Sequence, residues 1–266
     1  MGQAEKGGHK MILALDVGNT NIVIGCIDNG NIVFDGRLAT NSAKTDMELA
    51  VLLKNILILN KIDIASLEGS IISSVVPPIN QALKNAVKLV TGKEPITISG
   101  CEGLKVDLDD PTQLANDLVV GAIAVLNDFP PPVVMIDMGT ATTIFVIDKS
   151  GSYIGGAIIP GLMVSQNALA STASLLPSIS LEPPKSVIGK NTIDAMQSGA
   201  IFGYASMIDG MLDKIEQELG TKTTVVATGG LSKCIIENCK HEIVYDKDLL
   251  LRGLWLIYQK HKNEDK

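Results

Sequence analysis

Residues 137–143 read Asp-Met-Gly-Thr-Ala-Thr-Thr and stand between two apolar runs, residues 133–136 and 144–147. An apolar run, an acid-and-glycine turn and a second β-branched run are typical of a β-hairpin with a polar tip. Glycine lets the backbone come close to a ligand, and threonine N–H and hydroxyl groups can donate to phosphate oxygens. Asp137, at the end of the first strand, is suited to hold a cation beside those oxygens. The alternative is a plain hairpin turn.

The same pattern occurs near the start of the chain. Residues 11–15 form an apolar run, residues 16–21 read Asp-Val-Gly-Asn-Thr-Asn, and residues 22–27 are again largely apolar. Two acid-tipped hairpins about half a chain apart indicate a duplicated domain. Such a pair could hold a polyphosphate from two sides.

Apolar periodicity predicts the elements of the first half. Three strands come first, and a helix that starts at Thr45 follows them. A buried strand at 71–76, a helix at 79–91 and a strand at 95–98 complete the half. This β-β-β-α-β-α-β order is that of a ribonuclease-H-like domain.

We therefore expect an α/β protein of two duplicated ribonuclease-H-like domains with a cleft between them. The first domain is expected at 11–118 and the second at 119–266. Residues 1–10 carry Gly-Gly-His before a second methionine, so we interpret them as a leader left from expression and exclude them from the fold.

Composition limits the classes of function. The chain has 266 residues, of which 46% are apolar and 19% are charged, which is typical of a soluble globular protein with a sizeable core. Its net charge of −7 and its lack of a basic run argue against nucleic acid as a partner. No run reaches the length of a membrane span, and the four cysteines lack zinc-site spacing. We expect a cytoplasmic protein with reduced thiols, no membrane association and an anionic small-molecule ligand.

Two further junctions are rich in glycine. Thr228-Gly229-Gly230 follows an apolar strand and comes before a helix, where glycines would let a flat ring lie on the backbone and the helix start would attract phosphate. Alternatively, this is a strand-to-helix turn that only needs positive φ. Residues 155–161, Gly-Gly-Ala-Ile-Ile-Pro-Gly, are either a tight connection or a place where an acceptor substrate comes close to the phosphates.

A carboxylate in a predicted helix is a candidate general base. Asp110 and Pro111 predict a helix start, and the helix is expected at 112–127. Asp117 lies in it among apolar and small residues, where a carboxyl group tends to be protonated and can act as a base near neutral pH. The alternative is a solvated acid at a helix edge.

Taken in chain order, several motifs resemble those of the type III pantothenate kinase family. They are residues 16–20, 74–77, 137–142, 155–161, 189–199, 228–230 and 248–254. The resemblance implies a homodimeric kinase of the acetate and sugar kinase, heat-shock ATPase and actin superfamily, with ATP in the cleft. The implied reaction is ATP-dependent phosphorylation of pantothenate to 4'-phosphopantothenate, the first step of coenzyme A biosynthesis.

The resemblance also implies roles for individual residues. The first phosphate loop would consist of Asp16, Val17, Gly18, Asn19, Thr20, Asn21, Ile22 and Val23. ATP would further contact Gly139, Thr140, Gly229 and Gly230. Asp137 would ligate a monovalent cation, potassium or ammonium, with magnesium as the second ion. Pantothenate would contact Leu108, Ala115, Asn116, Asp117, Leu118 and Thr192. Of these, Thr192 would act across a dimer interface and Asp117 would be the proton acceptor.

Three positions depart from the family pattern. The Gly-x-Asp-Arg motif has Ala115 for its glycine and Leu118 for its arginine, and the tyrosine expected upstream is Leu108. Arginine binds a carboxylate through a forked pair of hydrogen bonds that leucine cannot form. The alternatives are a paralogue with a different acceptor and a non-catalytic nucleotide-binding or regulatory protein. A basic side chain from elsewhere, such as Arg37 or Lys190, would favour pantothenate.

Overall fold

The computed structural model describes residues 11–264, so the predicted leader lies outside the described residues. Contacts divide the chain into two compact units. The first unit is Met1–Gly103, Thr112–Ala124 and Leu250–Lys266, and the second is Leu104–Pro111 and Val125–Leu249, as far as these ranges are described. Helix α8 (Leu249–Glu264) thus belongs with the first unit, and the expected boundary after residue 118 falls inside helix α3 (Asn116–Asp128).

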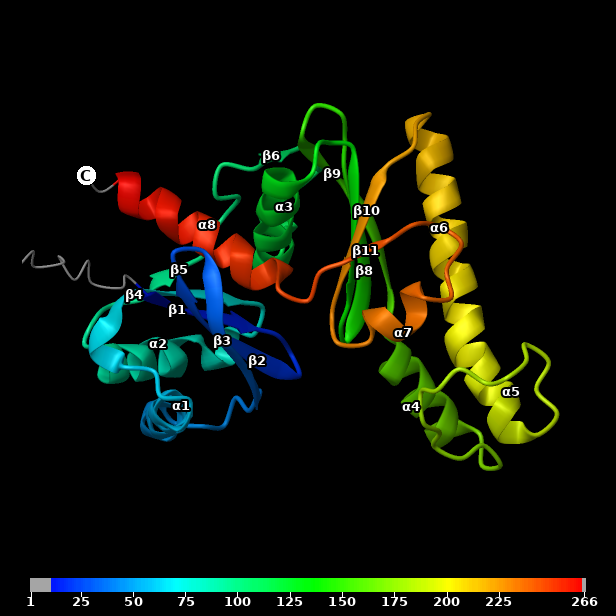
Figure 1. Ribbon diagram of the computed structural model, residues 1–266, viewed down its shortest axis with the longest axis horizontal. Helices are drawn as coiled ribbons and strands as arrows, with labels where there is room; N and C mark the ends of the chain where they lie inside the picture. The colour runs from blue at the N-terminus through cyan, green and yellow to red at the C-terminus, as the bar shows by residue number, and fades with distance from the viewer. Residues whose placement is uncertain (1–10, 265–266) are drawn as a thin grey trace, which may run out of the picture. The chain divides into compact units, whose positions relative to one another are not determined.

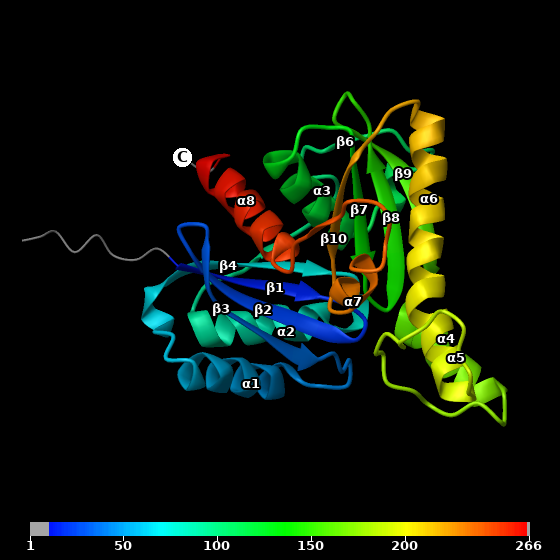
Figure 2. The same cartoon turned by 45° about the vertical axis from the view of Figure 1, so that its right-hand side comes forward.

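The first unit is built on a five-stranded sheet of order β3-β2-β1-β4-β5. Its strands are β1 (Met11–Val17), β2 (Asn21–Asp28), β3 (Asn31–Ala39), β4 (Leu67–Ser74) and β5 (Ile96–Thr97). Its other elements are α1 (Asp46–Leu59), the 3-10 turn η1 (Ile64–Ser66) and α2 (Pro77–Thr91). The first three strands are antiparallel, whereas β4 pairs parallel with β1 and β5 pairs parallel with β4. Helices α1 and α2 cover one face of this sheet and α8 covers the other (Figures 1 and 2).

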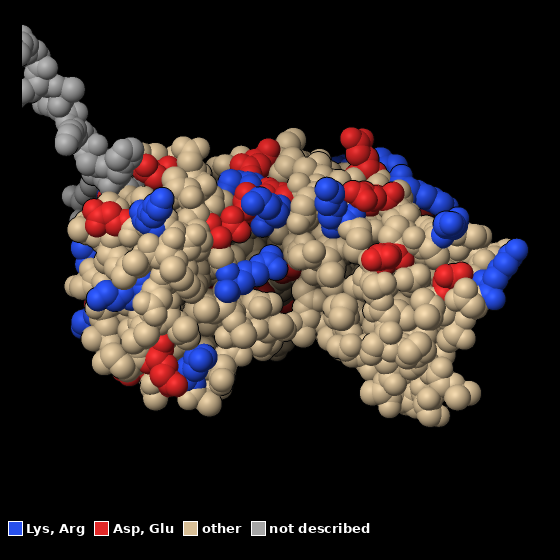
Figure 3. Space-filling view, turned by 60° about the horizontal axis from the view of Figure 1, so that its bottom comes forward, with Lys and Arg blue, Asp and Glu red and all other residues tan. Residues whose placement is uncertain are grey.

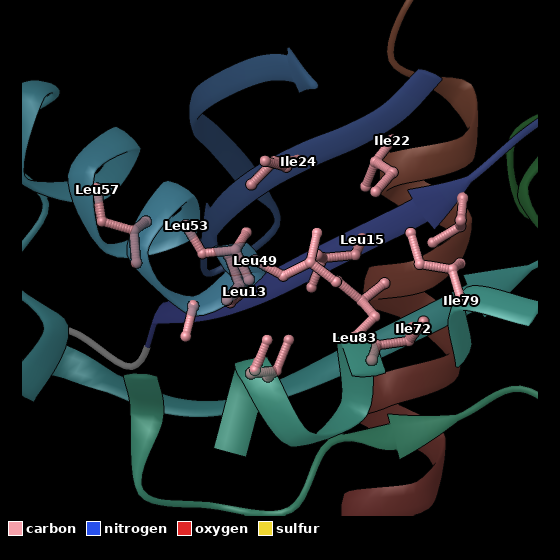
Figure 4. Packing of buried hydrophobic residues seen from close by; sticks show 14 of the residues in the cluster. Leu13, Leu15, Ile22, Ile24, Leu49, Leu53, Leu57, Ile72, Ile79 and Leu83 are labelled. Carbon is pink, nitrogen blue, oxygen red and sulfur yellow. The ribbon is translucent and has the colours of Figure 1, made fainter. Parts of the chain in front are cut away.

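Alternation along the strands accounts for the core of the first unit. On the face toward α1 and α2, β1 and β2 place aliphatic side chains against leucines of α1, as Figure 4 shows for Leu13, Leu15, Ile22, Ile24, Leu49 and Leu53. Helix α1 starts where the sequence predicts. The Thr45 side chain accepts from the Glu48 N–H and the Glu48 side chain accepts from the Thr45 N–H, which forms a capping box.

The second unit is built on a six-stranded sheet of order β11-β10-β7-β8-β9-β6. Its strands are β6 (Lys105–Val106), β7 (Val133–Met138), β8 (Ala141–Ile147), β9 (Ser152–Pro160), β10 (Thr224–Thr228) and β11 (Val244–Tyr245). Its helices are α4 (Leu162–Thr172), α5 (Thr192–Ser198), the π-helical turn η3 (Gly199–Gly203), α6 (Tyr204–Leu219) and α7 (Ser232–Ile236). Helix α6 runs along one face of the sheet (Figures 1 and 2).

The two units repeat one arrangement. Without the short edge strand β6, the order β9-β8-β7-β10-β11 corresponds strand by strand to β3-β2-β1-β4-β5. Each unit therefore has the β-β-β-α-β-α-β arrangement of a ribonuclease-H-like domain, which confirms the predicted duplication.

Two helices differ from the prediction. The helix expected from Thr112 begins at Asn116, because residues 111–113 form a separate 3-10 turn, η2 (Pro111–Gln113). Asp117 therefore lies in the first turn of α3 and not in its interior. Residues 192–219, whose sequence predicts one long helix, instead form α5 and α6, joined by the wide turn η3. Within residues 11–264, no helix combines the length and the apolarity that a membrane crossing needs.

Candidate functional site

The β1–β2 turn of the first unit is a short, closed tip. Gly18 N donates to the Asn21 carbonyl oxygen at 3.0 Å, which closes the turn. The end of β3 supports it, because Thr40 Oγ1 donates to the Gly18 carbonyl oxygen at 2.7 Å and Thr40 N donates to the Thr20 carbonyl oxygen at 3.0 Å. Asn19, Thr20 and Asn21 are exposed, whereas Asp16, Val17 and Ile22 are buried and Val23 is half-buried. The predicted phosphate loop is thus a braced turn with a polar, exposed tip.

Asp16 belongs to a row of side chains across the first sheet. It pairs with Val23 on β2 and with Ser73 on β4, and Val23 pairs with Arg37 on β3. Residues paired across strands point to the same face, so Arg37, Val23, Asp16 and Ser73 lie on one face of the sheet. Arg37 is exposed, whereas the Ser73 hydroxyl is fully buried and has no hydrogen-bond partner among the described residues.

Helix α3 begins at the same end of the first sheet. Asn116 Nδ2 donates to the carbonyl oxygens of Ser74, at 3.1 Å, and Ile98, at 3.3 Å, so the start of α3 is tied to the end of β4 and to the residue after β5. Because Val120 of α3 and Ile12 of β1 belong to one apolar cluster, α3 lies on the face to which Asp16 also points. The first unit by itself therefore brings Asp16 and Asp117 to one end and one face of its sheet.

Asp117 has an environment suited to a base. Burial raises the pKa of its carboxyl group above the ordinary value, and a hydrogen bond that Leu118 N donates to Oδ1 at 2.8 Å works in the opposite direction. A carboxylate with a raised pKa is a better proton acceptor near neutral pH than a solvated one. Ala115 and Leu118, the two substituted motif positions, are half-buried on either side of it.

The β7–β8 turn of the second unit corresponds to the β1–β2 turn. Gly139 N donates to the Ala141 carbonyl oxygen at 3.0 Å, and Gly139 and Thr140 are exposed. Asp137 pairs with Thr143 on β8 and with Thr228 on β10, so three oxygen-bearing side chains lie in one row on one face of the sheet.

The row beside Asp137 fits a cation. The Thr143 hydroxyl is buried and has no hydrogen-bond partner within the part of the chain that the structure describes. In that same part, no three His, Cys, Asp or Glu side chains gather closely enough to hold a metal ion. A cation at Asp137 would therefore depend on hydroxyl and carbonyl oxygens, which are the ligands that hard cations prefer.

Two glycines pack against the β7–β8 turn. A Cβ at Gly161 would lie 2.4 Å from the carbonyl oxygens of both Gly139 and Thr140, and Gly161 N donates to the Thr140 oxygen at 3.1 Å. A Cβ at Gly229 would lie 2.5 Å from the Met138 carbonyl oxygen, and the φ of Gly229 is +103°. Gly229 is thus required by its conformation and by close packing, whether or not a nucleotide lies against it and the exposed Gly230.

Thr192 opens onto a cavity within the second unit. The cavity has a volume of about 580 Å³ and is lined mainly by apolar or small side chains, together with Gln166, whose Oε1 is buried without a hydrogen-bond partner among the described residues. Its volume falls within the range of small-molecule sites, but the hollow is wide open to solvent. Leu108 belongs to the same unit, where its Cδ2 would lie 3.6 Å from a Cβ at Gly155 of β9.

Sequence reasoning missed Ser73, Thr143 and Thr228 as partners of the two aspartates. The available signal was the presence of hydroxyl residues within the strands, since Ser73 lies in β4 and Thr143 in β8 next to apolar residues. That signal alone does not show which residues of neighbouring strands share a row with Asp16 or Asp137, because this depends on the strand register.

Comparison with known proteins gives consistent similarities. The family model described as type III pantothenate kinase matches residues 12–214. A type III pantothenate kinase of Exiguobacterium sp. is 40% identical over 254 residues, which are 95% of this chain and 100% of that protein. A type III pantothenate kinase of Bacillus cytotoxicus is 37% identical over 253 residues, which are 94% of this chain and 97% of that protein.

Solved structures with low sequence identity share the fold. They include an inorganic polyphosphate/ATP-glucomannokinase from Arthrobacter sp. strain KM, with a TM-score of 0.52 and 13% identity over 95% of this chain and 100% of that one. They also include MreB5 of Spiroplasma citri bound to ADP, with a TM-score of 0.51 and 14% identity over 96% of this chain and 98% of that one. The two duplicated domains therefore have the actin-like ATPase fold.

Proposed function

The chain belongs to the type III pantothenate kinase family, and from that premise we propose how its residues divide the work of phosphoryl transfer. The protein is an ATP-dependent kinase that phosphorylates pantothenate to 4'-phosphopantothenate, the first step of coenzyme A biosynthesis. The observation that carries the proposed mechanism is Asp117, a carboxylate with a raised pKa on the first turn of α3.

Asp117 is the general base. It accepts the proton of the primary hydroxyl of pantothenate while the hydroxyl oxygen attacks the γ-phosphorus of ATP and ADP leaves. Such a step depends on position, since an error of about 1 Å can cost two orders of magnitude in rate. The anchoring of Asn116 to the Ser74 and Ile98 carbonyl oxygens supports this role, because it fixes the residue next to the base.

The two acid-tipped turns hold the phosphates. Backbone N–H groups and exposed hydroxyl groups at residues 18–21 and 139–140 donate to phosphate oxygens. Asp16 fits magnesium, which is commonly bound by one or two carboxylates together with substrate phosphates. Asp137, Thr143 and Thr228 fit a monovalent cation, potassium or ammonium. When bound, the two ions neutralise negative charge on the phosphates.

Arg37 replaces the missing motif arginine as the partner of the pantothenate carboxylate. Leu118 cannot bind an anion, whereas Arg37 stands exposed on the sheet face that also carries Asp16. We expect Arg37→Ala to raise the KM for pantothenate with little change in the KM for ATP. Lys190→Ala, at an exposed basic residue of the second unit, is the matched control. An unchanged KM for pantothenate in Arg37→Ala would contradict this assignment.

The protein also acts as a cytoplasmic homodimer in which Thr192 contacts pantothenate across the interface. Residues 150–181 contain no charged side chain, and the end of the second unit that carries α4 and α5 shows few charges (Figure 3). Ile158 and Leu175 are 75% and 91% exposed. Such exposed apolar surface favours a protein interface. Sedimentation should detect a dimer that Leu175→Glu weakens and Leu59→Glu, at a 79% exposed leucine of α1, does not.

The test of the proposed function is transfer of phosphate from ATP to pantothenate by the purified protein with magnesium and potassium present. Turnover that Asp117→Asn lowers by about 10²–10⁴ supports the mechanism. Bound ATP without turnover on pantothenate would favour a different acceptor, which a screen of primary alcohols that lack a carboxylate would detect. Bound ATP without turnover on any acceptor would favour a non-catalytic role.

A further inference from the structure

Tyr204 holds a position that the mechanism above does not use. It is the first residue of α6, it is 8% exposed, and its ring belongs to the apolar cluster between α6 and the second sheet. Its hydroxyl group donates to Thr142 Oγ1 at 2.6 Å and also reaches the Pro160 carbonyl oxygen at 3.1 Å. Burial raises the pKa of Tyr204, so the phenol stays a neutral donor at physiological pH.

Both partners of the Tyr204 hydroxyl adjoin the β7–β8 turn. Thr142 is fully buried and pairs with Met138, so these two residues close the turn on β8 and β7. Pro160 ends β9 and pairs with Ala141, the last residue of the turn. A single hydroxyl group therefore fixes one end of the turn and the strand beside it.

The segment before Tyr204 determines which face of α6 carries the tyrosine. Residues 199–203 form the wide turn η3, and such turns occur often at functional sites. One extra residue in a helical turn rotates all later residues by about 100°. The wide turn η3 therefore determines toward which side of α6 the Tyr204 side chain points.

We propose that Tyr204 is a positioning residue for the ATP-phosphate turn between β7 and β8. Its hydroxyl group holds Thr142 and the end of β9 in the arrangement that keeps the turn N–H groups aimed at phosphate, without touching the nucleotide itself. This inference rests on the proposed function, because it takes the β7–β8 turn to bind ATP. The proposed base Asp117 belongs to the first unit, whereas Tyr204 belongs to the second.

Tyr204→Phe tests the inference, because it removes only the hydroxyl group. We expect the Kd and the KM for ATP to rise about tenfold, as for the loss of one well-formed hydrogen bond. The KM for pantothenate and the kcat at saturating ATP should change less than twofold. Tyr258→Phe on α8 is the matched control, since Tyr258 is 7% exposed and burial also raises its pKa. It should leave ATP binding unchanged.

Thr142 provides a second, independent variant. Thr142→Val keeps the shape but removes the hydroxyl group that Tyr204 contacts, so it should weaken ATP binding as Tyr204→Phe does. Thr142→Ser keeps the hydroxyl group and should restore most of the affinity. The double variant of Tyr204→Phe and Thr142→Val should bind ATP no more weakly than either single variant, because both remove the same contact.

Isothermal titration with ATP in the absence of pantothenate distinguishes the outcomes. A Tyr204→Phe protein that melts at a lower temperature but binds ATP as the wild type does would overturn the inference and leave Tyr204 with a purely structural role. If Tyr204→Phe does not fold, normal ATP affinity of Thr142→Val would overturn it equally. Wild-type protein that binds no ATP would overturn both the inference and the proposed function.

Discussion

Gly161→Ala is the sharpest probe of the β7–β8 turn. Gly161 follows β9, and its backbone lies against the two exposed residues of the turn. An added Cβ would lie 2.4 Å from the carbonyl oxygens of Gly139 and Thr140. Both neighbours are backbone atoms, so no side chain can rotate away to relieve the overlap.

The size of the effect follows from that distance. Ordinary van der Waals contact of a Cβ begins at 3.4 Å, so the turn or the start of α4 must move by up to about 1 Å. Overpacking of this kind typically costs about 1–3 kcal/mol of stability. A displacement of about 1 Å in a phosphate-binding group can lower the rate by about 100-fold. We therefore expect kcat/KM for ATP to fall by about two orders of magnitude at a temperature at which the variant is still folded.

The assay is steady-state phosphorylation of pantothenate at 25 °C, together with thermal unfolding followed by circular dichroism. Gly210→Ala is the matched control, because a Cβ at Gly210 in α6 would meet nothing within 4 Å. Alanine inside a helix should stabilise the protein by about 0.5–1 kcal/mol and leave kinetics unchanged. Wild-type kcat/KM in folded Gly161→Ala protein would refute the assignment of the β7–β8 turn to ATP.

Three other substitutions have defined outcomes. Asp117→Asn should lower kcat by about 10²–10⁴ and yet raise the melting temperature. Burial raises the pKa of Asp117 in the folded protein above the ordinary 3.8. As the pH rises, Asp117 therefore ionises at a lower pH in the unfolded chain than in the folded protein. Above pH 4 its ionisation favours the unfolded chain and lowers the free energy of unfolding. The gain in melting temperature should accordingly be largest at neutral pH and vanish well below pH 4, and a pH-independent gain would contradict this cause. Thr143→Val should weaken activation by potassium without destabilising the fold, because its hydroxyl has no partner among the described residues; unaltered potassium titrations would argue against a cation there. Asn116→Ala should cost about 1–3 kcal/mol, measured by urea unfolding, because two carbonyl oxygens lose their donor.

The order of elements could be predicted from the sequence because local patterns determine it. The apolar runs of β1 and β2, and the capping box that joins Thr45 to Glu48, depend only on neighbours in the chain. The second unit could be predicted from the duplication, because its acid-tipped hairpin repeats that of the first unit. These features together predicted two ribonuclease-H-like domains before any contact between distant residues was known.

The start of α3 could not be predicted in this way. Asp110 and Pro111 are a good local signal for a helix start, but a 3-10 turn satisfies the same signal, and η2 forms there. The first residue of α3 is set by hydrogen bonds from Asn116 to residues 42 and 18 positions earlier in the chain. Propensity cannot report such long-range partners, so Asp117 was expected in the interior of a helix.

Comparison of the two duplicated turns supports the proposal that a monovalent cation binds at the second. Asp16 and Asp137 occupy corresponding positions, and each has a hydroxyl residue on its parallel neighbour, Ser73 on β4 and Thr228 on β10. Their antiparallel neighbours differ, because Asp16 pairs with Val23 whereas Asp137 pairs with Thr143. The second row thus offers one oxygen more than the first, and a weakly held ion such as potassium needs several neutral oxygens around one carboxylate. The first unit has Val23 at the strand position where the second unit has Thr143, and this difference favours Asp137 over Asp16 as the potassium ligand.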